Sequence, residues 1–374
     1  MIGMPGLRVA LAALILLFLS VLPAAAQQVS AVTVAKDVQM GWALAFLPGG
    51  DMLVTERPGN IRRISARGEL GAPIRGVPEV LFKGQGGMLD LAVDSQFASN
   101  RTIYFCFSET GEGGNSTALA RAKLTADSRS LTDVKTIFRQ RPKIDSRVHF
   151  GCRIVEAADG NLFLTLGERF SRMQDAQTLD NHHGKIVRIT KDGGVPADNP
   201  FVKRSGALPE IWSLGHRNLQ GAAFDGTGRL WTIEHGPQGG DELNRPEAGK
   251  NYGWPIITYG ENYGGGRIGE GITEKPGLEQ PVHYWKPSIA PSGLAFLTSD
   301  RYGPAWKNSV FVGSLKFKYL ARLPIAGDRA GPEERVIDLE GRVRDVRQGP
   351  DGLLYVLIEA PLGRIVRLEP RGKP

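Results

Sequence analysis

The feature that most constrains the fold is a segment type that recurs six times along the chain. Each copy joins a turn signal to a short run of strand-forming residues. Copies start about 45 to 75 residues apart, the length of a four-stranded propeller blade with variable loops. They are LPGGDMLVTE (47–56), DSQFASNRTIYF (94–105), EAADGNLFLTLGE (156–168), FDGTGRLWTIE (224–234), DRYGPAWKNSVFVGS (300–314) and GPDGLLYVLIE (349–359).

Most copies are followed by a second strand in which apolar and basic residues alternate. Such alternation buries one face of a strand and leaves the other in water. We therefore predict an all-β chain that forms a single six-bladed β-propeller domain over residues 27–374, with a pair of β-sandwiches as the alternative. The alternating strands are GNIRRIS (59–65), GKIVRIT (184–190), YLARLPI (319–325) and GRIVRLE (363–369), and ALARAKL (118–124) is a looser match.

Residues 1–26 have the pattern of a signal peptide. Arg8 gives a positive start, residues 9–22 are apolar, and three alanines at 24–26 form a small-residue cleavage site. The apolar run is short for a membrane span, so we expect cleavage near Gln27, export to the periplasm and no stable membrane insertion afterwards. An uncleaved anchor is the alternative.

Two cysteines exclude a disulfide-stapled scaffold and a cysteine metal cluster. Cys106 lies in the apolar run YFCF, where a buried free thiol is the common finding. Export makes a bridge to Cys152 chemically permissible, but we expect both cysteines to be free.

The formal net charge is +7 and the pI is about 9.4. Lys and Arg are scattered, without a basic block or an aromatic-plus-basic RNA motif, which argues against a nucleic-acid partner. The basic balance fits a pocket for an acidic small molecule or a solvated surface.

Inner strands of a propeller converge on its axis, so residues next to them can meet although they are distant in sequence. Candidates from five recurrences carry a proton-transfer group, an amide or a positive charge. Together they predict a polyanionic ligand at the axis. They are Gln85, His149, Arg217, Lys316, Arg342 and Arg344.

The segment EHGPQGGDELNRPEAGKNYGWP (234–255) has neither helical nor strand periodicity. It is rich in carboxylates, amides and turn carbonyls, which are the oxygens that Ca2+ binds in proteins. It predicts a divalent metal beside the polyanion, or alternatively a long surface loop.

In this order the six segments resemble the soluble aldose sugar dehydrogenases that use pyrroloquinoline quinone (PQQ). The most specific stretches are GHRNLQG (215–221) and the oxygen-rich segment, and the resemblance covers the mature chain. It implies a six-bladed propeller with the quinone across its axis and Ca2+ beside the reactive carbonyl.

The resemblance also implies roles for single residues. His149 matches the catalytic base, and Arg217 matches the arginine that flanks the quinone. The remaining matches are cofactor contacts (Gln85, Lys316, Arg342 and Arg344), carbonyl ligands of the first Ca2+ (Gly236 and Pro237) and ligands of a second, structural Ca2+ (Glu242 and Tyr252, the latter through its backbone oxygen).

The implied reaction oxidises an aldose mono- or oligosaccharide at its anomeric carbon to an aldonolactone, with electrons passing on to an external acceptor.

Cys152 stands where this motif more often has Gly. The long loops of glucose-specialised relatives are missing, which argues against narrow glucose specificity and their dimer, so we expect a monomer. Alternatives are a calcium-dependent lactonase and a non-catalytic propeller that binds sugar or a protein.

Overall fold

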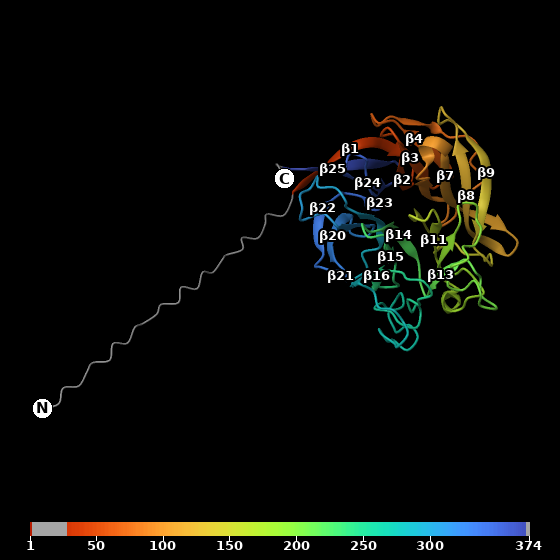
Figure 1. The fold of residues 1–374 in the computed structure, drawn as a ribbon, viewed down its shortest axis with the longest axis vertical. Coiled ribbons are helices and arrows are strands. Elements are labelled where there is room, and N and C mark those ends of the chain that lie inside the picture. The colour runs from red at the N-terminus through yellow and green to blue at the C-terminus, as the bar shows by residue number, and fades with distance from the viewer. Residues whose placement is uncertain (2–27, 372–374) are drawn as a thin grey trace.

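The computed structural model describes Met1 and residues 28–371, so the predicted signal peptide lies, except for Met1, outside the described residues. The described chain forms six antiparallel sheets arranged around a common centre (Figure 1). This arrangement confirms the six-bladed β-propeller and excludes the sandwich pair.

The first three blades follow one another along the chain, each with its first strand innermost. Blade 1 contains β2 (Gly41–Phe46), β3 (Met52–Glu56), β4 (Asn60–Ile64) and β5 (Leu70–Pro73). Blade 2 contains β6 (Met88–Val93), β7 (Thr102–Gly111), β8 (Gly114–Leu124) and β9 (Leu131–Arg139), with α1 (Phe97–Asn100) before β7. Blade 3 contains β10 (Gly151–Glu156), β11 (Leu162–Leu166), β12 (Lys185–Ile189) and β13 (Ile211–Leu214), with the 3-10 helix Met173–Gln177 before β12.

The last three blades repeat this order, and the sixth is completed from the other end of the chain. Blade 4 contains β14 (Leu219–Phe224), β15 (Leu230–Glu234), β16 (Asp241–Asn244) and β17 (His283–Trp285). Blade 5 contains β18 (Pro291–Phe296), β19 (Ser309–Ser314), β20 (Tyr319–Ala326), β21 (Arg329–Ala330) and β22 (Glu334–Asp338). Blade 6 contains β23 (Arg342–Gln348), β24 (Leu354–Glu359), β25 (Gly363–Pro370) and the N-terminal β1 (Val29–Val38).

Each of the six recurrences forms the turn into the second strand of a blade together with that strand. The alternating basic segments form the third strands of five blades. The ring closes where β1 pairs with β25 in an antiparallel register from Val29↔Pro370 to Val38↔Gly363. Closure in this way covers the sheet edge that an open propeller would expose.

Every inner strand has a β-bulge near its start. The register against the second strand shifts between Gly41 and Leu44 in β2, and at the equivalent place in β6, β10, β14, β18 and β23. A bulge bends the strand and leaves a backbone N–H without its ladder partner. The axis of the ring therefore carries N–H groups that need acceptors from elsewhere.

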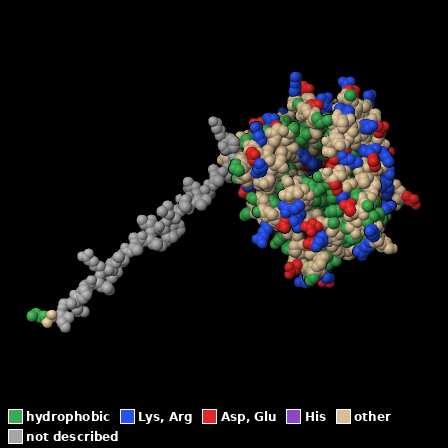
Figure 2. Space-filling view, in the orientation of Figure 1, with side chains coloured by type: hydrophobic (Ala, Val, Ile, Leu, Met, Phe, Trp, Pro, Cys, Tyr) green, Lys and Arg blue, Asp and Glu red, His purple; other side chains and the backbone are tan. Residues whose placement is uncertain are grey.

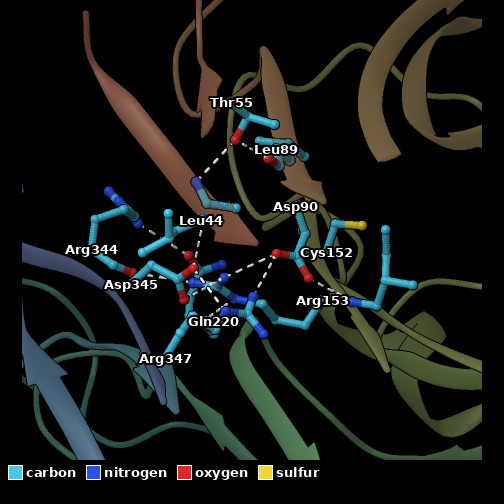
Figure 3. Close-up of polar contacts among 12 residues, drawn as sticks. Leu44, Thr55, Leu89, Asp90, Cys152, Arg153, Gln220, Arg344, Asp345 and Arg347 are labelled. Atoms are coloured by element: carbon cyan, nitrogen blue, oxygen red, sulfur yellow. Dashed lines mark hydrogen bonds and ion pairs between the residues drawn. The ribbon is translucent and has the colours of Figure 1, made fainter. Parts of the chain in front are cut away.

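A buried ion network at the axis supplies acceptors for two of these strands, β2 and β10 (Figure 3). The Arg153 guanidinium lies 3.1 Å from Asp90 Oδ1 and 2.9 Å from Asp345 Oδ1. The Asp90 carboxylate accepts the Ile154 N–H at 2.7 Å, and that of Asp345 accepts the Leu44 N–H at 3.0 Å.

Further contacts bring the remaining blades into this network. Arg153 also donates to the carbonyls of Gln220 at 2.8 Å and Arg344 at 3.1 Å, and the Ser292 hydroxyl donates to the latter carbonyl at 2.7 Å. Arg347 forms a second ion pair with each of the two carboxylates. All six inner strands are thus joined through one buried cluster.

The expectation that both cysteines are free is wrong, because Cys106 and Cys152 form a disulfide. Cys106 lies in β7 and Cys152 in β10, so the bond joins blade 2 to blade 3 in the core. Each cysteine, taken alone, fits an apolar strand position. Their pairing depends on how neighbouring blades pack, which strand patterns do not reveal.

No helix among the described residues is long and apolar enough to cross a membrane.

We expect Arg153→Ala to lower the free energy of unfolding by about 3–5 kcal/mol, because it removes one partner from a buried ion cluster and leaves carboxylates undercompensated. Urea unfolding at pH 7 measures this. The control is Lys250→Ala, which breaks an exposed pair with Glu279 and is expected to change stability by less than about 1 kcal/mol. Equal losses in the two variants would contradict the central role of Arg153.

Candidate functional site

Six of the predicted site residues line two adjoining cavities that share His235, whereas His149, Arg217, Glu242 and Tyr252 line neither. The smaller, about 130 Å³, is lined by Gln85, Arg342 and Arg344 among others. The larger, about 660 Å³, is lined by Gly236, Pro237 and Lys316 among others. Viewed as in Figure 2, the ring is hollowed near its centre, and basic side chains lie in the hollow.

His149 and Glu168 form a buried pair beside the smaller cavity. His149 Nδ1 lies 3.1 Å from Glu168 Oε1, and because a carboxylate only accepts, Nδ1 carries the proton. Nε2 is then the acceptor atom of a neutral ring. Burial lowers the pKa of His149, Glu168 opposes this shift and the charge of Arg217 adds to it. The imidazole is therefore uncharged at neutral pH and able to take up a proton.

The backbone around His149 is held by the neighbouring blade and by close packing. The His149 N–H donates to Gln85 Oε1 at 2.8 Å, which joins two predicted site residues directly. A Cβ on Gly167 would come within 2.1 Å of the His149 carbonyl oxygen. Glycine at position 167 is therefore required for this loop to pack against its own blade.

Arg217 lies beside the oxygen-rich segment. Its guanidinium donates to the carbonyls of His235 at 3.0 Å and Gly236 at 2.6 Å, and it lies 5.2 Å from the ring of Trp254. Its backbone N–H donates to Glu234 at 2.5 Å. Arg217 Nε is buried and has no hydrogen-bond partner among the described residues, so this donor can serve a ligand.

Three arginines converge on the Glu359 carboxylate next to the smaller cavity. Arg344 lies 2.6 Å, Arg342 3.3 Å and Arg57 3.7 Å from it. Burial alone would raise the pKa of Glu359, but Arg344 and Arg342 outweigh burial and hold this pKa below its ordinary value. Three cations against one carboxylate leave a net positive charge, which suits an anionic ligand.

Lys316 is exposed and lies with Gly236 and Pro237 at the larger cavity, whereas the three arginines line the smaller one. The turn at Gly236 is fixed by Asp241, whose buried carboxylate accepts the Gly236 N–H at 2.9 Å. Asp241 also accepts three hydrogen bonds from Ser288, Ile289 and Ala290. This network positions Gly236, which with Pro237 would supply the carbonyls that the family resemblance assigns to a first Ca2+.

Glu242 and Tyr252, assigned to a second Ca2+, are each linked to Glu234 through a neighbouring residue. Asn244 Nδ2 donates to Glu242 at 2.9 Å and to Glu234 at 3.0 Å. The Tyr252 ring stacks at 4.8 Å on His216, whose Nδ1 in turn lies 2.9 Å from Glu234. The two predicted ligands are therefore linked through one cluster.

This cluster fits a cation. Asn244 Oδ1 is buried and has no hydrogen-bond partner among the described residues. Burial, followed by the nearby charges of Glu234 and Asp241, raises the pKa of Glu242 to about 8. Within the described part of the chain no group of three or more His, Cys, Asp and Glu could hold a metal, so amide and carbonyl oxygens would have to complete a Ca2+ site.

The sequence analysis missed Arg57, Glu168, Glu359 and His235. A signal for two of them is present, because the quoted recurrences end on Glu56, Glu168, Glu234 and Glu359. An acidic residue that recurs at or just after the end of the second strand occupies an equivalent position in several blades.

A family model described as Glucose / Sorbosone dehydrogenase matches residues 38–367. The chain belongs to this family. Aldose sugar dehydrogenase YliI of Escherichia coli (strain K12) is 47% identical to it over 335 residues, which are 88% of this chain and 90% of the relative.

Solved structures agree with this membership of the glucose/sorbosone dehydrogenase family. The apo-form of the soluble aldose sugar dehydrogenase of Escherichia coli superimposes with a TM-score of 0.88 at 44% identity, covering 92% of this chain and 100% of the other. The PQQ-bound aldose sugar dehydrogenase of Streptomyces coelicolor superimposes with a TM-score of 0.77 at 32% identity, covering 94% and 100%.

We expect Ca2+ to raise the free energy of unfolding by about 2.7 kcal/mol at a hundredfold excess over its dissociation constant. Glu242→Gln should abolish most of this gain, because it removes a charged oxygen from the cluster. Thermal unfolding with Ca2+ and with a chelator measures the effect. Glu247→Gln makes the same charge change at an exposed position of the segment and should retain the full Ca2+ response; equal responses in both variants would refute the site.

Proposed function

We propose that this chain oxidises aldose sugars at the anomeric carbon to aldonolactones, with PQQ as cofactor and Ca2+ as a second cofactor. One observation carries the proposal. In a member of this dehydrogenase family, a buried neutral histidine with a carboxylate partner stands beside a cavity with an excess of positive charge. The solved structure of the aldose sugar dehydrogenase of Streptomyces coelicolor is of its PQQ-bound form, which supports the choice of cofactor.

The residues present fit this quinone. PQQ carries three carboxylates, and Arg57, Arg342 and Arg344 at one cavity and Lys316 at the next offer four positive charges against the single carboxylate of Glu359. Gln85 would add a polar contact from a different blade. When bound, the quinone supplies the acceptor for the hydride that leaves the sugar.

His149 would take the proton of the anomeric hydroxyl at Nε2, while Glu168 fixes the tautomer and orients the ring. Arg217 has an unused buried Nε donor and would stabilise negative charge on an oxygen nearby. Trp254 packs against the Arg217 guanidinium and limits its motion.

Gly236 and Pro237 would offer their carbonyls to the first Ca2+. The Gly236 oxygen accepts one hydrogen bond from Arg217 and keeps a second lone pair, so it can serve both. Glu242, Asn244 and the backbone oxygen of Tyr252 would hold the second Ca2+.

We also propose where the enzyme acts and which molecules it reacts with. Residues 1–26 would direct export and be removed, leaving a monomer in the periplasm. The substrate would be an aldose mono- or oligosaccharide, and the electrons would pass to an external acceptor.

Reconstitution tests this function directly. Purified protein supplied with PQQ and Ca2+ should reduce a dye when aldoses are added, and His149→Ala should lower kcat by a factor of about a hundred or more, because the proton acceptor is lost. A quinone absorbance titration checks that the variant still binds the cofactor. Full activity of His149→Ala, or lactone hydrolysis by quinone-free protein with no dye reduction, would refute the proposal.

Glu168→Gln provides a test by pH. Glu168 raises the pKa of His149, so its loss should lower that pKa further and move the acid limb of kcat/KM to lower pH. The maximal rate should fall about 10- to 100-fold, because the ring is a weaker and less oriented base. Asp175→Asn alters another His–carboxylate pair, which is partly buried and has His183 at 2.7 Å, and should leave the pH profile in place. A parallel shift in both variants would count against His149 as the base.

A further inference from the structure

Cys152 has an exceptional backbone conformation. Its φ is +99°, and it is the only non-glycine residue of the six inner strands with a positive φ. It lies within the bulge of β10, between Gly151 and Ile154. Glycine adopts such a φ easily, whereas any residue with a Cβ adopts it only where its surroundings hold it there.

The disulfide is the bond that holds Cys152. Its partner Cys106 lies in the middle of β7, where Cys106 opposes Leu119 of β8 within a long regular hairpin. Both cysteines are fully buried. The side chain of Cys152 is therefore anchored to the most extensively paired hairpin of the neighbouring blade.

Cys152 follows His149 by three residues, and the short segment between them is fixed at every position. Blade 2 supplies the Gln85 amide to the His149 N–H and the Thr117 hydroxyl, at 2.8 Å, to the Phe150 carbonyl. Asn218 of blade 4 accepts the Gly151 N–H at 3.2 Å. Immediately after Cys152 the chain reaches the axial Arg153 (Figure 3).

We propose that the Cys106–Cys152 disulfide is a positioning device for His149. By holding Cys152 in a glycine-like conformation, the bond fixes the path of residues 149–153 and keeps the His149 ring against Glu168. The activity readout of this proposal rests on the proposed function. A merely stabilising bond would instead leave the geometry of His149 unchanged when it is removed.

Two double variants separate these roles. Cys106→Ala/Cys152→Ala and Cys106→Ala/Cys152→Gly both lack the bond and differ by a single Cβ at position 152. Alanine still carries the Cβ that disfavours a φ of +99°, whereas glycine accepts this φ. Alkylation of the unfolded, unreduced wild-type protein, read by mass spectrometry, checks first that no free thiol is present; two free thiols would overturn the proposal.

With PQQ, Ca2+ and an aldose, the Ala/Ala variant should lose about a hundredfold in kcat/KM, the scale expected when a reacting group is displaced by about 1 Å. The loss should fall on kcat rather than on KM, and the Ala/Gly variant should recover most of it. Both variants should have a lower Tm than the wild type. Equal kcat/KM in the two variants, whether high or low, would overturn the positioning role.

An NMR titration of His149 provides a readout that needs no activity. The groups that set its charge are Glu168, Arg169 and Arg217. Separation from Glu168 should lower the His149 pKa in the Ala/Ala variant and leave it near the wild-type value in the Ala/Gly variant. If the wild type oxidises no aldose, the proposed function fails, while this comparison still decides the role of the disulfide.

Discussion

The closed ring depends on the buried ion pairs that Arg153 forms with Asp90 and Asp345. The bulges of β2 and β10 leave the N–H groups of Leu44 and Ile154 at the axis, and the carboxylates of Asp345 and Asp90 accept them. Two buried carboxylates are tolerable only with a countercharge in contact. Arg153 provides it from a third blade and Arg347 adds a second countercharge, so a shift of β6, β10 or β23 would separate buried charges from their partners.

The candidate site is built directly on this axis. His149 precedes Arg153 by four residues, and Arg344, which lines the cavity, precedes Asp345 by one, so both groups are set by neighbours that are locked in the ion network. The Arg344 carbonyl itself accepts hydrogen bonds from Arg153 and Ser292. The constraint that closes the ring therefore also orients the cavity, which is the preorganisation that a catalytic site needs.

The sequence predicts what is local and repeated, and fails where neighbouring blades meet. Turn chemistry and strand period identified the second strands of all six blades. The family resemblance assigned Gln85, Arg342 and Arg344 to one ligand, and in the structure all three line one cavity. The Cys106–Cys152 bond was missed because each cysteine fits its own strand, and only inter-blade packing brings them together. Contacts between blades leave no periodic signal in a single sequence.

One repeated position shows how a symmetric fold produces an asymmetric site. Glu168, Glu234 and Glu359 stand near the ends of second strands in three blades, yet their partners differ. The first accepts from His149 and fixes the tautomer and orientation of its ring, the second fixes the backbone of Arg217, and the third gathers arginines at the cavity. Residues just before or at the start of the inner strand, joined for Glu359 by Arg57 of blade 1, determine what each carboxylate does. The repeat supplies the carboxylates, and the loops between repeats convert them into distinct chemical roles.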